Sequence, residues 1–172
     1  MHKINKKENE IHYTWEKLKP LKNFNQVSNN DESKTQYVTR IQKQFSIPKE
    51  VLTQWLFEHY HNEHTINNYG WINFSKVCFS LKYFPIEEIH EFNVIEDYRD
   101  LVQHRSSHGA FDCFCCIKKD INYWKKYMTW RVPPILIDSS NFNNIPEHSE
   151  IKGKYQLVEG HSRLGYLFAA EK

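Results

Sequence analysis

The sequence predicts an α+β fold, in which a helical N-terminal region packs on a small core made of a strand hairpin and a helix. Two observations predict this class. Apolar residues recur at helical spacing through residues 37–109, whereas short apolar runs typical of strands occur at residues 132–137 and 155–158. Of the 172 residues, 40% are hydrophobic and 15% are aromatic, which is enough to fill a core.

Residues 1–36 are expected to form a flexible arm. They are rich in Lys, Asn, Glu and Ser, and the run from Asn23 onward shows no apolar periodicity. Within the arm, Trp15, Leu18 and Leu21 are spaced by three residues, which is compatible with one helical turn docked on the rest of the chain.

Three helices are predicted in the helical region, residues 37–109. The first begins at Pro48, since proline is tolerated in the first turn, and it ends near His64, ahead of an Asn-Asn-Tyr-Gly turn. Apolar residues over 71–81 predict the second helix. Pro85 opens a third, whose apolar residues continue along one stripe past residue 100.

The remaining residues, 110–172, are expected to form the α+β core. Asp120 can cap a short helix, and a final helix follows Gly160, which breaks the last strand. Prolines stand at the start of the middle strand, where a missing N–H is tolerated. The strands are predicted at residues 110–117, 132–137 and 155–158.

Glycine scarcity excludes two common nucleotide loops. The five glycines form no G-x-G-x-x-G pattern, so a Rossmann dinucleotide site is not expected. Gly160 and Gly165 have the spacing of a P-loop, but Tyr166 and Leu167 stand where that loop needs Lys and a hydroxyl.

Charge and hydropathy point to a cytoplasmic protein. The formal net charge of +2 is too small to imply a nucleic-acid partner by itself. No apolar run approaches the roughly 18 residues of a membrane span, and the first residues lack the apolar region of a secretory signal. The clustered Cys113, Cys115 and Cys116 do not resemble a disulfide framework.

The segment Glu159-Gly160-His161-Ser162-Arg163 lies between a predicted strand and a predicted helix. A helix N-terminus exposes N–H groups and a partial positive charge, and a glycine there lets a ligand approach the backbone. Arg163 opposes the helix dipole, but a bound phosphate would reverse that penalty by accepting from the guanidinium and the amides. We therefore expect a phosphate site at this helix start.

Two segments, WRVPPILID and YQLVEGHSRLGYLFAAEK, together resemble the ParB/sulfiredoxin-like superfamily. The family's mark is a strand ending in Gly, two variable residues, then Arg entering a helix, followed by Leu and small residues. Those positions are held here by Gly160, Arg163, Leu164 and Ala169-Ala170, and the resemblance covers residues 130–172.

The resemblance implies a bacterial NTPase or kinase that binds ATP or another nucleotide, with Mg²⁺, at Gly160, His161, Ser162 and Arg163. Sulfiredoxins have Cys at the position of His161, so sulfinic-acid repair is not expected. Partition proteins have Glu-Arg at the positions of His161-Ser162 and continue into a DNA-binding domain, whereas this sequence stops at Lys172, so partitioning is not expected either.

If the site is catalytic, Glu159 and His161 are the nearest general acid/base candidates. Simpler roles remain open for each residue. Arg163 can pair with Glu159 or another surface carboxylate. Glu159 can cap the helix or pair with Arg131, and His161 can donate to a carboxylate.

Two groups of residues have the chemistry of metal ligands. The first does not form the H-E-x-x-H pattern, and the second lacks the usual two-residue gap between cysteines. A polar helix end and a buried strand explain them as well, so no structural metal is predicted. The groups are His59, His61 and His64, and His104, His108, Cys113, Cys115 and Cys116.

The stretch from Arg99 to Arg131 is locally basic, with Tyr123, Trp124, Tyr127 and Trp130 interleaved near its end. Cations beside aromatic rings suit single-stranded nucleic acid or a nucleotide base, and they equally suit an amphipathic helix with a solvated lysine face. The alternatives to a nucleotide-binding protein are therefore a DNA nuclease or DNA-binding protein of the same superfamily, or a non-catalytic interaction module of the immunity type with a protein partner.

Overall fold

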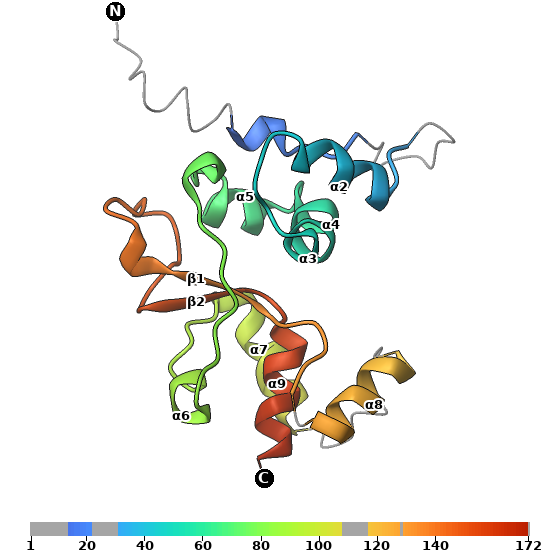
Figure 1. Cartoon of the computed structure of the whole chain (residues 1–172). Helices are drawn as coiled ribbons and strands as arrows, with labels where there is room; N and C mark the ends of the chain where they lie inside the picture. Colours follow the sequence, from blue (N-terminus) through green and yellow to red (C-terminus); the bar gives the residue numbers. More distant parts are fainter. Residues whose placement is uncertain (1–13, 22–30, 108–116, 128, 172) are drawn as a thin grey trace, which may run out of the picture. The chain divides into compact units, whose positions relative to one another are not determined.

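The structure, a computed structural model, describes residues 14–21, 31–107, 117–127 and 129–171. These residues form helices and a two-stranded antiparallel sheet, so the chain is α+β, as the sequence predicts (Figure 1). The chain divides into two compact units. Unit 1 is Met1–Tyr83 with Pro146–Ser149, and unit 2 is Phe84–Ile145 with Glu150–Lys172. The domain boundary predicted between residues 109 and 110 lies outside the described residues.

Among its described residues, unit 1 is helical wherever it has regular structure. Its elements are α2 (Lys34–Gln42), α3 (Lys49–Val51), η1 (Leu52–Leu56), α4 (Phe57–His59), α5 (Glu63–Tyr69) and η2 (Phe74–Lys76). A capping box opens α2, because the Ser33 hydroxyl accepts from the Gln36 N–H and the Gln36 side chain accepts from the Ser33 N–H. The elements α3, η1 and α4 follow without a break, and η1 is a π-helical turn between two α-helical ones.

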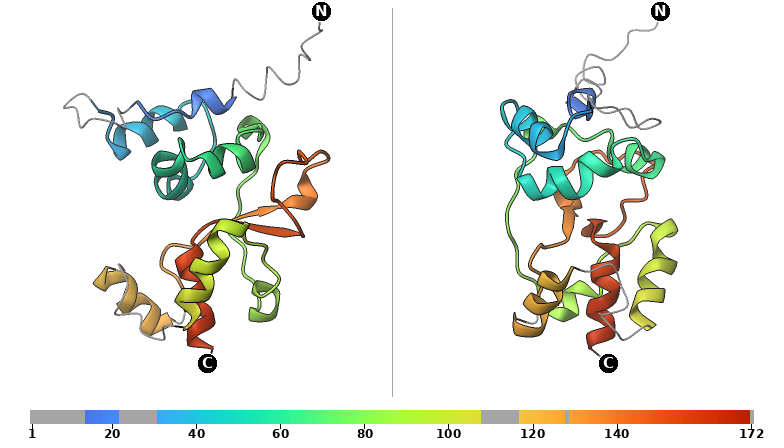
Figure 2. Two further views of the ribbon diagram at one scale, coloured as in Figure 1. Left: turned by 180° about the vertical axis from the view of Figure 1, so that it is seen from behind. Right: turned by 90° about the vertical axis from the view of Figure 1, so that its right-hand side faces the viewer.

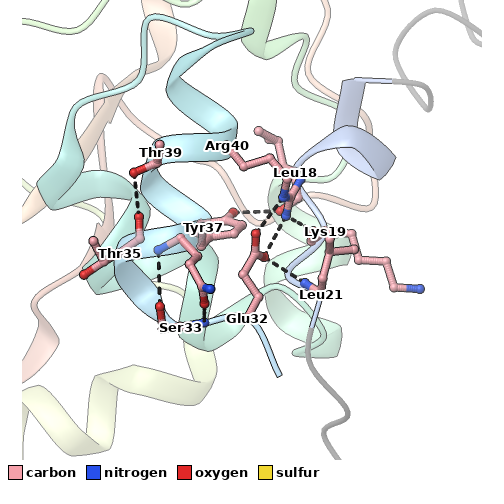
Figure 3. A network of polar contacts seen from close by, with 10 residues as sticks. Leu18, Lys19, Leu21, Glu32, Ser33, Thr35, Tyr37, Thr39 and Arg40 are labelled. Atoms are coloured by element: carbon pink, nitrogen blue, oxygen red, sulfur yellow. Dashed lines mark hydrogen bonds and ion pairs between the residues drawn. The ribbon is translucent and has the colours of Figure 1, made fainter. Parts of the chain in front are cut away.

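A polar network fastens the segment before α2 to that helix (Figure 3). The Arg40 guanidinium donates to both carboxylate oxygens of Glu32, at 2.7 and 2.8 Å, and also to the carbonyl of Lys19 at 2.8 Å. The Tyr37 hydroxyl donates to the carbonyl of Leu18 at 2.7 Å. Tyr37 and Leu18 are both completely buried.

The docked helical turn predicted in the arm is confirmed for Trp15 and Leu18. Residues 14–17 are helical, Leu18 is fully buried, and the Trp15 ring stacks on Tyr60 with centroids 4.9 Å apart. Leu21 is exposed, so it takes no part in that docking. An apolar turn therefore forms part of the core of unit 1. The expectation of a flexible arm over residues 1–36 is wrong for residues 14–21 and also for residues 32–36, because Glu32 pairs with Arg40, Ser33 caps α2 and the helix begins at Lys34.

Two helix predictions in unit 1 need correction. The helix from Pro48 ends at His59, because Asn62 caps a separate helix, α5, by accepting from the Thr65 N–H at 3.3 Å. The helix predicted over 71–81 is wrong. Asn73 caps only the short η2, and residues 77–85 form no helix. Leu81, an apolar residue of the predicted helix, is 66% exposed, so it supplies little of the burial that stabilises a short helix.

Unit 2 contains four helices, a short 3₁₀ turn and the sheet among its described residues. Its elements are α6 (Ile86–Ile89), α7 (Glu96–Ser107), α8 (Lys118–Tyr127), β1 (Ile135–Asp138), η4 (Ser139–Asn141), β2 (Tyr155–Glu159) and α9 (His161–Ala170). The strands predicted at residues 132–137 and 155–158 are confirmed as β1 and β2, and the predicted final helix is confirmed as α9. The strand predicted over 110–117 lies almost wholly outside the described residues.

The third predicted helix is broken into α6 and α7 because the backbone between them pairs with β2. Asn93 donates from its N–H to the carbonyl of Tyr155 at 2.8 Å and accepts from the Leu157 N–H at 2.9 Å. Its side chain also bonds Gln156, which is fully buried. Because the backbone N–H and carbonyl of Asn93 bond to β2, they do not form helical hydrogen bonds. The predicted helix is therefore interrupted at this residue.

The core of unit 2 lies between the sheet and the two helices α7 and α9, which run side by side (Figure 2). Leu157 of β2 packs with Val102 of α7 and Leu164 of α9. The two helices approach closely at Gly165, where an added Cβ would lie 2.6 Å from the Val102 carbonyl oxygen. This packing fixes the position of the first turn of α9 relative to the end of β2.

Candidate functional site

The predicted phosphate site is the turn from β2 into α9. Gly160 is the N-cap residue of α9, with φ of +105°, a backbone conformation that side-chain-bearing residues rarely adopt. The Leu164 N–H bonds the Gly160 carbonyl at 2.9 Å, which closes the first helical turn. The sequence prediction of a strand–glycine–helix transition at this residue is therefore confirmed.

The N-cap residue of α9, Gly160, has no side chain that could cap the first amides of the helix. The first turn of α9 contains no acidic residue. The first N–H groups of an α-helix have no partner within the helix, and the helix dipole places partial positive charge there. The amides of His161, Ser162 and Arg163 thus supply donors suited to an anion.

The Arg163 guanidinium lies over the backbone of Gly160. Its Nε and Nη2 atoms are 3.0 Å from the position that a Cβ on Gly160 would occupy, and the Pro134 Cβ is 2.9 Å from it on another side. Nη1 donates to the carbonyl oxygens of Val132, at 2.7 Å, and Pro133, at 3.3 Å. Arg163 therefore fixes the segment before β1 against the β2–α9 turn.

Glu159, the last residue of β2, accompanies Arg163. Its Oε1 lies 3.6 Å from Nη2 of Arg163, an i,i+4 ion pair between half-buried side chains. Arg131, the other partner considered for Glu159, forms its ion pair with Asp120 of α8 instead. The pairing of Arg163 with Glu159 that the sequence left open is thus present, and it keeps the positive charge beside Gly160.

His161 is buried in the first turn of α9 and stacks on Tyr98 of α7. The two ring centroids are 4.2 Å apart, with 29° between the ring planes. Ser162, the next residue, is half-buried. The structure thus brings Glu159, Gly160 and Arg163 together at one turn, while His161 faces α7.

Sequence reasoning missed Tyr98 and the carbonyls of Val132 and Pro133. Tyr98 belongs to the apolar stripe after Pro85, and its stacking on His161, 63 positions later, leaves no local pattern in the sequence. A signal did exist for the carbonyls. Two consecutive prolines remove N–H donors from the start of β1, and a segment that cannot pair through N–H groups offers its carbonyls to another donor.

The metal-ligand groups noted in the sequence have different outcomes. Among the residues that the structure describes, no group of three or more His, Cys, Asp or Glu side chains is arranged to hold a metal ion. His59 lies at the end of α4 and His64 in α5. The cysteines Cys113, Cys115 and Cys116, with His108, lie outside the described residues.

Within the described parts of the chain, no helix has both the length and the apolar character that crossing a membrane requires. Comparisons of the chain with protein-family models, with curated proteins and with solved structures found no match.

Proposed function

We propose that the chain binds a phosphate-bearing small molecule, a nucleotide, at the start of α9, within a ParB/sulfiredoxin-like core at residues 130–172. The observation that carries this proposal is the first turn of α9, which follows a glycine N-cap, has no acidic residue and has Arg163 at its third position. Amides and a guanidinium that converge on one turn are the donors that phosphate oxygens accept from.

The ligand approaches from the Ser162 side of the turn. Gly160 and His161 are buried, whereas Ser162 is half-buried, so its hydroxyl and the amides of Ser162 and Arg163 are the donors nearest solvent. The Arg163 side chain contributes mainly its charge, because Nη1 is held by the carbonyls of Val132 and Pro133. The anion and Glu159 compete for Nη2 of Arg163.

A nucleotide brought as its Mg²⁺ complex would place the metal near Glu159, the carboxylate of the turn. Carboxylates and phosphate oxygens are ordinary ligands of Mg²⁺, which keeps several waters in such sites. The metal would offset phosphate charge next to that carboxylate. The proposal concerns binding, and general acid/base roles for Glu159 and His161 remain sequence predictions.

Calorimetric titration with ATP, ADP, CTP and GTP, with and without Mg²⁺, tests the proposal. Arg163→Ala is expected to weaken binding about 10- to 100-fold, the loss of one charge-assisted interaction. Arg163→Lys keeps the charge and should recover part of the affinity. Arg99→Ala is the matched control, because exposed Arg99 also donates to a backbone carbonyl, that of Val94 at 3.1 Å.

No binding of any nucleotide to the unmodified chain would overturn the proposal, and so would equal affinity of the Arg163→Ala and Arg99→Ala variants. Circular dichroism melting of each variant shows whether it is folded, and Arg163→Lys keeps the test informative if Arg163→Ala unfolds. Metal-dependent nicking of plasmid DNA, abolished by Glu159→Ala, would instead favour the nuclease alternative.

A further inference from the structure

Helix α8 of unit 2 presents one strongly basic face. At 3.6 residues per turn, its four lysines and Asn122 fall within an arc of about 120° around the helix axis. All five side chains are exposed. Lys118 and Lys125 form one pair two turns apart, and Lys119 and Lys126 form another, with about 10.5 Å along the axis between the members of each pair.

The opposite face of α8 is used for packing. Trp124 is 5% exposed, and its ring lies 4.3 Å from the ring of Trp130. Asp120, the only acidic residue of the helix, is paired with Arg131. The helix therefore carries a net charge of +3, from four lysines and one aspartate. The aspartate forms its ion pair with an arginine outside the helix.

Two tyrosines follow the edge of the lysine arc that Lys119 and Lys126 form, Tyr123 about 40° and Tyr127 about 80° beyond Lys119 around the helix axis. Tyr123 and Tyr127 lie one turn apart with ring centroids 4.6 Å from each other, and Tyr127 is 51% exposed. The Nζ of Lys126 lies 4.8 Å from the centroid of the Tyr127 ring. An exposed aromatic ring is thus held beside the lysine face rather than within the core.

These observations favour one class of polyanion over two others. A membrane-surface helix inserts an apolar face, but the apolar side of α8 is occupied by Trp124 packed on Trp130. Lysines are depleted at the centres of protein interfaces, whereas in nucleic-acid interfaces they neutralise phosphates. Aromatic rings next to cations stack on unpaired bases.

We infer that the lysine face of α8 (Lys118, Lys119, Lys125 and Lys126), together with the Tyr127 ring beside Lys126, binds single-stranded nucleic acid without sequence preference. The lysines neutralise backbone phosphates and Tyr127 stacks on a base. Duplex is disfavoured because its bases are already stacked on one another. This surface shares no residue with the site at the α9 start, so each of the two proposals can fail without the other.

Fluorescence anisotropy of a labelled oligothymidylate, titrated with the full chain at several salt concentrations, tests the inference. Four lysine–phosphate contacts predict a slope of log K against log[salt] of about −2.8, and Lys119→Gln/Lys126→Gln should reduce it to about −1.4. Tyr127→Ala should weaken binding roughly 5- to 100-fold with an unchanged slope, because stacking releases no counterions.

The matched control is Lys43→Gln/Lys49→Gln, which removes the same two charges from exposed positions of unit 1. This control should keep both the affinity and the slope within about twofold, as expected for charges that contact no phosphate. Lack of binding to oligothymidylate at low salt would overturn the inference, as would equal losses in the two double variants. Tighter binding to duplex of the same length, to polyglutamate or to phosphatidylserine vesicles would overturn it too, since each identifies another class of partner.

Discussion

Replacing Gly160 with alanine tests why a glycine stands between β2 and α9. Its φ of +105° costs a residue with a side chain about 1–2 kcal/mol. The new Cβ would also lie 2.9 Å from the Pro134 Cβ and 3.0 Å from the Arg163 guanidinium, and such overpacking costs about 1–3 kcal/mol. Gly160→Ala should therefore lower the free energy of unfolding by about 2–5 kcal/mol.

Gly153 provides the matched control in the same unit. Its φ is +71°, and a Cβ added there would meet no atom within 4 Å. Gly153→Ala should therefore cost only the conformational term, about 1–2 kcal/mol. Restriction of the unfolded chain is the same in both variants, so the difference between them, about 1–3 kcal/mol, isolates the close approach of Pro134 and Arg163.

Urea unfolding followed by circular dichroism measures both losses. The m-values should stay equal, so that the shift in midpoint reports stability. Adding Arg163→Ala to Gly160→Ala should recover part of the excess, because one of the two contacts is then gone. Equal losses of stability for Gly153→Ala and Gly160→Ala would refute the inference that Pro134 and Arg163 lie too close to Gly160 to admit a Cβ there.

Two further predictions concern packing and pH. Gly165→Ala should lower the free energy of unfolding by about 1–3 kcal/mol, seen as a lower Tm, because its Cβ would lie 2.5 Å from the Arg105 Cβ, and helix propensity offsets this only in part. Burial raises the pKa of Glu32, but the hydrogen bonds from Arg40 and from the Leu21 N–H and the charge of Arg40 lower it more, so the net pKa is below 4.5. The ion pair therefore stabilises unit 1 above the unfolded pKa and is lost as the pH falls through the lower folded pKa. Glu32→Gln should lower the free energy of unfolding by about 2 kcal/mol at neutral pH and should remove the fall in stability at acid pH. Urea unfolding at a series of pH values from neutral to acid measures both effects. An unchanged dependence of stability on acid pH in the variant would contradict the assignment.

Local patterns were sufficient to predict the elements around the α9 start. The apolar run of β1 follows two prolines, β2 ends at Gly160, and the spacing of Leu164, Leu167 and Phe168 is helical, so each boundary is visible in the chain itself. The same patterns predict a helix wherever apolar residues recur at spacings of three and four, which is why the stripe after Pro85 predicts one helix.

The errors come from interactions between distant parts of the chain. Asn93 leaves the helical stripe because its backbone pairs with β2, which lies about 60 residues later. In the site, the contacts of Arg163 with Val132 and Pro133 and the stacking of His161 on Tyr98 depend on how β1, α7 and α9 pack. Residue types predict a phosphate site at this turn, but only packing decides which groups meet there.

Amide chemical shifts test the central claim most directly, because the proposed donors are backbone N–H groups. In a ¹⁵N-labelled sample titrated first with inorganic phosphate and then with ATP, the amides of His161, Ser162 and Arg163 should shift together and saturably, with a smaller affinity for phosphate alone. The same titration of Arg163→Lys should show these shifts at higher ligand concentration. Unmoved amides at these three residues, while ATP shifts others such as those of α8, would contradict the account.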